Sequence, residues 1–156
     1  MRMGDADKAK TVFRNELADN SNDFEANLFL GMLLRQDKQF DEAFKYESRA
    51  VRLRPRDQYA RYQLAAVYAA IAKPNEALPL LEGVVKEYPE FVEAHALLAT
   101  VYYRLSRKED GKRESAIVQK LNAEQQAKQP GSQNGNNQRV PVKPPDNFDN
   151  RNEDRR

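Results

Sequence analysis

Apolar residues recur at helical spacing along residues 58–91 and divide this stretch into two segments joined by a short turn. In the first segment the apolar or small residues stand three or four positions apart, as on one face of a helix: Ala60, Leu64, Ala65, Val67 and Tyr68. A second stripe of the same kind follows Pro74, a residue suited to a first helical position, and Pro89 ends it. Residues 58–91 are therefore a predicted helical hairpin.

The hairpin pattern recurs at a period of 34 residues. Leu30, Leu64 and Leu98 fall in register, and a small residue follows each of them. The second helices carry their own in-register series of small residues: Ala9, Ala43, Ala77 and Gly111. Helix axes about 8–10 Å apart need small side chains on one side of the contact. The register also places Glu47 and Ser115 where Leu81 packs in the central copy, so the outer copies are atypical, as is common in stacked repeats.

This period and these residue types resemble the tetratricopeptide repeat. The resemblance implies an all-α fold, an α-α superhelix or solenoid of helix-turn-helix repeats. It divides residues 1–128 into a half repeat and three full repeats: 1–23, 24–57, 58–91 and 92–128. Residues 129–156 are rich in asparagine, glutamine and proline and have too few apolar side chains to form a core, so they are a predicted disordered tail.

The pattern also predicts where individual helices begin and end. In the first complete copy we expect helices near Phe24 to Asp37 and Asp41 to Arg54. Pro79 should kink the second helix of the central copy without breaking it, because it lies close to the helix start. The last helix should run on to Lys128, since no terminator precedes Pro130, and we expect this extension to cover the open end of the stack.

The chain begins in the middle of a repeat. Residues 1–20 have the turn and the second helix of a copy whose first helix is absent, with an expected apolar stripe of Ala9, Val12, Phe13 and Leu17. Part of this stripe should lack a partner helix. We interpret the sequence as truncated at its start, with a finished N-terminal cap as the alternative, and self-association through the incomplete repeat is one expected consequence.

Composition argues against catalysis and narrows the partners. The chain has 156 residues, a formal net charge of +2, no cysteine and one histidine. This net charge is too small to indicate a protein that binds mainly nucleic acid. The chain also lacks thiolate ligands for a metal and the usual catalytic pairs of nucleophile and base. His95 should pack in the core, and we expect no catalytic residue, no metal and no cofactor.

The location of the protein in the cell stays open. No stretch approaches the roughly 20 apolar residues of a membrane span, and the first residues include no apolar signal segment. The sequence as written favours the cytoplasm. A missing upstream signal segment would instead allow a periplasmic or secreted protein.

The resemblance implies a protein-protein interaction scaffold whose first helices line a concave groove. Helical spacing places nine side chains of these helices in the predicted partner-binding groove: Leu28, Met32, Arg35, Tyr59, Tyr62, Ala66, Thr100, Tyr103 and Arg104. Chaperone-binding members of the family hold a terminal carboxylate with basic residues and asparagine on this face, where this chain has Leu28, Phe29, Met32, Gln63 and Leu97.

Two functions agree with these observations. The first is a non-catalytic scaffold that binds an apolar or amphipathic peptide or helix of a protein partner in the groove. The second is the substrate-selecting arm of a larger enzyme or envelope assembly, truncated at its N-terminus. The tail also has a PxxP spacing, Pro141 to Pro144, which suits a polyproline II helix that docks elsewhere.

Overall fold

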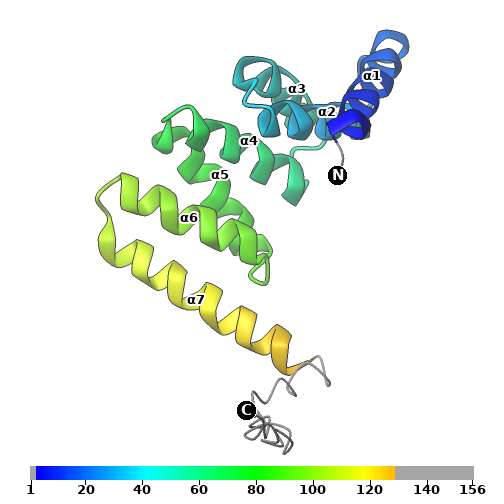
Figure 1. Ribbon diagram of the computed structural model, residues 1–156. Coiled ribbons are helices and arrows are strands. Elements are labelled where there is room, and N and C mark those ends of the chain that lie inside the picture. Colours follow the sequence, from blue (N-terminus) through cyan, green and yellow to red (C-terminus); the bar gives the residue numbers. More distant parts are fainter. Residues whose placement is uncertain (1–2, 129–156) are drawn as a thin grey trace, which may run out of the picture.

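The computed structural model describes residues 3–128, which form seven α-helices and no strand (Figure 1). The helices are α1 (Met3–Asp19), α2 (Phe24–Gln36), α3 (Phe40–Leu53), α4 (Gln58–Ala70), α5 (Pro74–Glu87), α6 (Val92–Arg104) and α7 (Lys108–Ala127). The predicted all-α class is confirmed, and the two helices of the first complete copy agree with their predicted bounds to within one residue. The predicted disordered tail and its PxxP segment lie outside the described residues.

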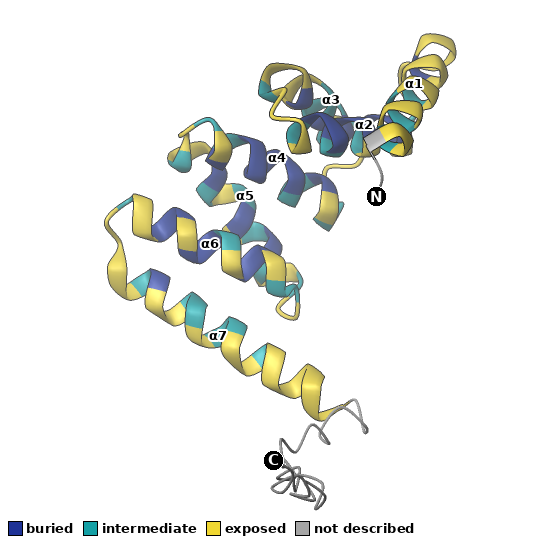
Figure 2. Cartoon of the chain, in the orientation of Figure 1, coloured by how far each residue is buried: buried dark blue, intermediate teal, exposed yellow. Residues whose placement is uncertain are grey.

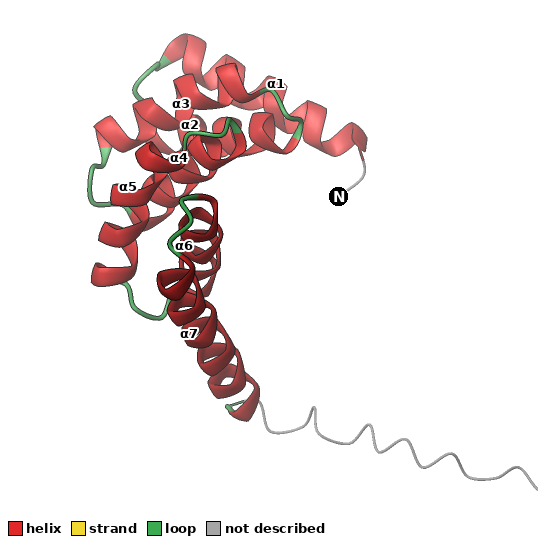
Figure 3. Ribbon diagram, turned by 90° about the vertical axis from the view of Figure 1, so that its left-hand side faces the viewer, coloured by secondary structure: helices red, strands yellow, loops and turns green. Residues whose placement is uncertain are grey.

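Three helical hairpins, α2–α3, α4–α5 and α6–α7, stack in a curved series, with α1 at one end (Figures 1 and 3). Each second helix contacts the first helix of the next hairpin. Only the first helices, α2, α4 and α6, also contact one another from hairpin to hairpin. In a curved stack the helices that approach each other lie on the inner side, so α2, α4 and α6 line the concave face.

The core follows the predicted register. Leu30, Leu64 and Leu98 are buried, and so are the small residues of the second helices, Ala43 and Ala77. Helix α5 continues from Pro74 through Pro79 to Glu87, so the internal proline does not break it. Small residues at the closest approach let the two helices of each hairpin pack tightly, and leucines fill the space around them.

The first two of the three complete copies begin with an aspartate cap. The side chains of Asp23 and Asp57 each accept a hydrogen bond from a backbone N–H three residues on, at 2.8 Å. Such a cap pairs one of the N–H groups that a helix start leaves free. The third copy has Phe91 at the corresponding position, and no side chain caps α6.

The helix that ends the stack corrects one expectation. Helix α7 extends to Ala127 as predicted, but the prediction that its extension covers the open end is wrong. Residues 122–127 are all exposed, and α7 packs against α6 alone (Figure 2). The physical reason is composition: between Leu121 and Lys128, where the described residues end, the only apolar residues are Ala123 and Ala127, and the polar side chains between them remain in water.

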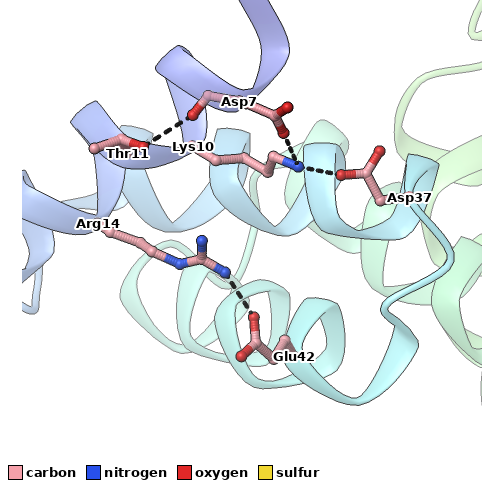
Figure 4. Close-up of polar contacts among 6 residues, drawn as sticks. All are labelled: Asp7, Lys10, Thr11, Arg14, Asp37 and Glu42. Atoms are coloured by element: carbon pink, nitrogen blue, oxygen red, sulfur yellow. Dashed lines mark hydrogen bonds and ion pairs between the residues drawn. The ribbon is translucent and has the colours of Figure 1, made fainter. Parts of the chain in front are cut away.

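Helix α1 packs on α2 in the way that a second helix packs on the next repeat. Leu17 is buried and Phe13 is half-buried, whereas Val12 is 52% exposed and lies outside the packed stripe. Two ion pairs join α1 to the following hairpin (Figure 4). Lys10 bonds Asp37, and the Arg14 Nη2 lies 3.0 Å from Glu42 Oε2.

Candidate functional site

A shallow apolar hollow of about 230 Å³ lies on the concave side between α2 and α4. Its lining consists of three residues of α2 and two of α4: Leu28, Phe29, Met32, Tyr59 and Gln63. The rings of Phe29 and Tyr59 are 42% and 53% exposed. Large apolar side chains are usually buried, so their exposure around one depression marks this surface as a candidate binding site. We call it the α2–α4 hollow.

Aromatic rings extend this apolar surface in both directions. The Phe13 ring on α1 stacks on Phe29, with ring centroids 5.8 Å apart and planes inclined by 20°. On the other side the Tyr59 ring meets Phe91 edge to face, with centroids 5.3 Å apart. The aromatic surface therefore reaches from α1 across α2 and α4 to the start of α6.

A second, larger hollow of about 560 Å³ lies beyond Tyr59. It is bounded by the start of α4, the α5–α6 turn at residues 88–91, the start of α6, and Asn122 and Gln125 of α7. Helix α7 reaches it because α6 and α7 are antiparallel and α7 has 20 residues against 13 in α6. We call it the α7 hollow.

The predicted groove residues do not all line one depression. Leu28, Met32 and Tyr59 come together around the α2–α4 hollow. Thr100 and Tyr103 instead line a third hollow of about 290 Å³, with Ser115, Val118 and Gln119 of α7. That third hollow belongs to the final hairpin, on the face where a further repeat would stack.

The other predicted residues lie around these hollows. The Arg35 Nη2 donates to Gln63 Oε1 at 2.8 Å, so Arg35 holds one wall of the α2–α4 hollow. Tyr62 is half-buried with its ring against Phe91, and burial raises the pKa of its hydroxyl. Ala66 is only 8% exposed. Arg104 donates a hydrogen bond to the Ala69 carbonyl at the end of α4.

Three residues of this surface were not among the nine predicted groove residues, although the family comparison had already placed Phe29 and Gln63 on the same face. Phe29 and Gln63 line the α2–α4 hollow, and Phe91 joins the two aromatic pairs beyond it. A signal for Phe91 was present, because it stands 34 residues after Asp57, where the first two copies have a capping aspartate. A large aromatic side chain at this position departs from the capping pattern of the first two copies.

The buried histidine of α6 lies within hydrogen-bonding distance of groups on α7 and in the α5–α6 turn. His95 is 4% exposed, and its Nδ1 lies 2.5 Å from Glu114 Oε2 while its Nε2 lies 3.0 Å from the Pro89 carbonyl oxygen. His95 therefore joins α6, α7 and the α5–α6 turn. Across residues 3–128 we find no group of three or more acidic or histidine side chains placed to hold a metal ion. Within the same residues, no helix has the length and apolar character needed to cross a membrane.

The chain belongs to the tetratricopeptide repeat family, whose family model matches residues 1–58 and 62–131. The fold is similar to that of MamA 41-end from Desulfovibrio magneticus RS-1, with a TM-score of 0.71, 27% identity, and coverage of 79% of this chain and 70% of that chain. A MamA RS-1 ArsTM double mutant gives a TM-score of 0.72 at 25% identity and covers 79% of this chain and 69% of that one. Tetratricopeptide repeats are typically non-catalytic scaffolds for protein interactions, and this chain has that architecture.

Two curated relatives are much longer proteins. The chain is 31% identical over 100 residues to the protein O-mannosyl-transferase Tmtc3 of Drosophila melanogaster, which is 62% of this chain and 11% of that protein. It is 34% identical over 76 residues to human protein O-mannosyl-transferase TMTC3, which is 47% of this chain and 8% of that protein. The similarity thus spans only a small part of either transferase.

Proposed function

We propose that this tetratricopeptide repeat chain is a non-catalytic scaffold that binds an apolar or amphipathic segment of another protein on its concave face. The α2–α4 hollow is the centre of the proposed site, with Leu28, Met32 and Tyr59 as contacts. Phe29 and Gln63 join the residues expected from the sequence. Thr100, Tyr103 and Arg104 would contact only a ligand long enough to reach the final hairpin.

The observation that carries this proposal is the exposed aromatic lining of the hollow. Phe29 and Tyr59 present large, rigid rings to solvent, and such side chains often contribute most of the free energy of protein association. Met32, in the same lining, adapts its shape to different ligands. Arg35 is fixed against Gln63 and presents a positive charge near the rim, which suits a ligand with an acidic flank.

A photo-crosslinking amino acid in place of Met32 tests the site directly. Irradiation should link the partner to this position. It should not do so when the same amino acid replaces Phe44, an exposed aromatic residue of α3 that lies outside the hollow. If the partner is crosslinked equally at positions 32 and 44, the proposed site is wrong.

The matched substitutions Tyr59→Lys and Phe44→Lys separate binding from folding. Tyr59→Lys removes a central ring and should weaken partner binding by about 2 kcal/mol or more, roughly thirtyfold. Phe44→Lys also replaces an aromatic ring with lysine, at a residue that is 37% exposed and outside the hollow, and should leave binding unchanged. Circular dichroism of both variants shows whether the helices persist.

The second candidate function is the repeat arm of a larger enzyme or envelope assembly, with substrate selection as its role. The match to 100 residues of a transferase, 11% of its length, favours this alternative, because the matched segment is a small part of a catalytic protein. Reading the coding sequence upstream of residue 1 discriminates the two functions. A catalytic or signal segment in frame supports the arm, and a stop codon in frame supports the stand-alone scaffold.

A further inference from the structure

The α7 hollow has a composition that suits a proline-containing ligand. Three aromatic rings, those of Tyr59, Tyr88 and Phe91, lie along it beside Pro89. Grooves lined by aromatic side chains bind polyproline II segments, because proline rings pack against flat aromatic faces and the extended segment loses little entropy on binding. The composition of this hollow therefore differs from that of the mainly apolar α2–α4 hollow.

The charged residues of its lining, Glu90 and Glu93, are both acidic and exposed. A ligand with positive charges beside its prolines would complement them. The chain itself contains such a segment at residues 139–145, Arg-Val-Pro-Val-Lys-Pro-Pro, in which Arg139 and Lys143 flank Pro141. We propose that this segment of the chain's own C-terminal region docks in the α7 hollow.

The position of α7 makes this contact accessible to the same chain. Gln125 lines the hollow, and α7 ends two residues later at Ala127. Eleven residues, 129–139, separate Lys128 from Val140. A random coil of this length has an average end-to-end distance of about 20 Å, and a fully extended chain of this length reaches about 40 Å. A segment tethered so close to its site has an effective concentration of the order of millimolar, so a weak contact is enough to hold it.

Docking of this segment has a consequence for the concave face. Tyr59 lines both the α7 hollow and the α2–α4 hollow. A segment packed on one side of this ring restricts its movement and covers part of its surface. The docked segment therefore competes with any ligand that needs Tyr59.

A paramagnetic label near the segment tests the proposal in the whole chain. The protein has no cysteine, so Gln138→Cys provides a unique attachment point for a nitroxide label. In an isotope-labelled chain, the amide signals of residues 88–93 should lose at least about half of their intensity relative to the reduced label, as expected within the reach of the nitroxide. Signals of α1, at the opposite end of the stack, should be unaffected.

Two pairs of substitutions test the contact, and a third pair on α1 is their control. Glu90→Lys with Glu93→Lys should restore the signals of residues 88–93, and so should Pro141→Ala with Pro144→Ala. Glu16→Lys with Asp19→Lys makes the same change of charge on exposed residues of α1 and should leave the effect in place.

Three results would overturn the proposal. The first is signal loss in residues 88–93 that survives the Glu90→Lys, Glu93→Lys pair. The second is signal loss confined to other residues, those of the α2–α4 hollow included. The third is full signal loss when the nitroxide and the isotope are on separate chains, because the segment would then dock on a second copy.

Discussion

The first and second complete repeats, residues 24–57 and 58–91, share one backbone plan but differ at a buried position of their second helices. Both begin with an aspartate cap, and both have a left-handed residue in the turn between their helices, Lys38 and Ala72, with φ of 61° and 57°. The position that Leu81 fills in the second repeat is occupied by Glu47 in the first, and both side chains are 0% exposed. The same fold thus tolerates a carboxyl group where it normally packs a leucine.

The chain makes room for this carboxyl group with a glycine. A Cβ added at Gly31 would stand 2.4 Å from Glu47 Cγ, whereas the second repeat has Ala65 at the matching position. Within residues 3–128, neither oxygen of Glu47 has a hydrogen-bond partner. Burial raises the pKa of Glu47 from 4.5 to about 8, and the charge of Arg35 opposes part of that rise. The first repeat therefore keeps its geometry but loses stability, since an unpaired buried polar group costs free energy.

The largest expected effect comes from removing this difference with Glu47→Leu. An unpaired buried carboxyl group costs about 3 kcal/mol, and more when it is ionised, so the variant should have a higher free energy of unfolding, most clearly at pH 8. Chemical denaturation followed by circular dichroism measures it. No gain at any pH would show that the carboxyl group is hydrated or paired in solution.

The same group predicts a dependence of stability on pH. Between pH 4.5 and about 8 the folded chain holds the Glu47 proton and the unfolded chain has lost it. The free energy of unfolding should therefore fall as pH rises through this range, by up to about 1.4 kcal/mol per pH unit from this group. Glu47→Gln keeps the shape of the side chain but has no group that titrates in this range. It should therefore flatten the dependence on pH and gain less stability than Glu47→Leu.

The next prediction concerns the glycine that accompanies Glu47. Gly31→Ala alone should lower the free energy of unfolding by about 2 kcal/mol, because the new methyl group overlaps the Glu47 side chain near its base. The Gly31→Ala, Glu47→Leu double variant reproduces the pair found in the second repeat and should remove this penalty. A double-mutant cycle measures the coupling, and additive effects would show that the two residues do not contact each other.

Most of the fold could be predicted from the sequence because it depends on local periodicity. The 34-residue register located the buried leucines, the small residues and the position of Glu47. The helix bounds of the first copy followed from the residues that favour helix starts and ends. The pairing of Glu47 with Gly31 also follows from the register, since the matching pair in the second repeat is Leu81 with Ala65.

The candidate site could be predicted only in part, for two physical reasons. The helical face of a residue does not say how adjacent hairpins are inclined, so Tyr103 was grouped with Tyr59 although the two line different hollows. The length of α7 was predicted, but its direction relative to the stack was not, and that direction creates the α7 hollow. Both are properties of packing between hairpins, which a single repeat does not contain.

The smallest predicted effect tests whether the two repeats differ only in their cores. Left-handed backbone at a residue with a Cβ costs about 1–2 kcal/mol, and glycine relieves this strain but has more freedom in the unfolded chain. Lys38→Gly and Ala72→Gly should therefore each raise the free energy of unfolding by about 0.5–1 kcal/mol. Ala70→Gly, in the last turn of α4, is the control and should lower it, because that residue is helical.

Similar gains at positions 38 and 72, measured by thermal melting, would confine the difference between the repeats to Glu47 and Gly31. A gain at only one of them would show that the turns also differ in strain, even though their φ angles agree within a few degrees.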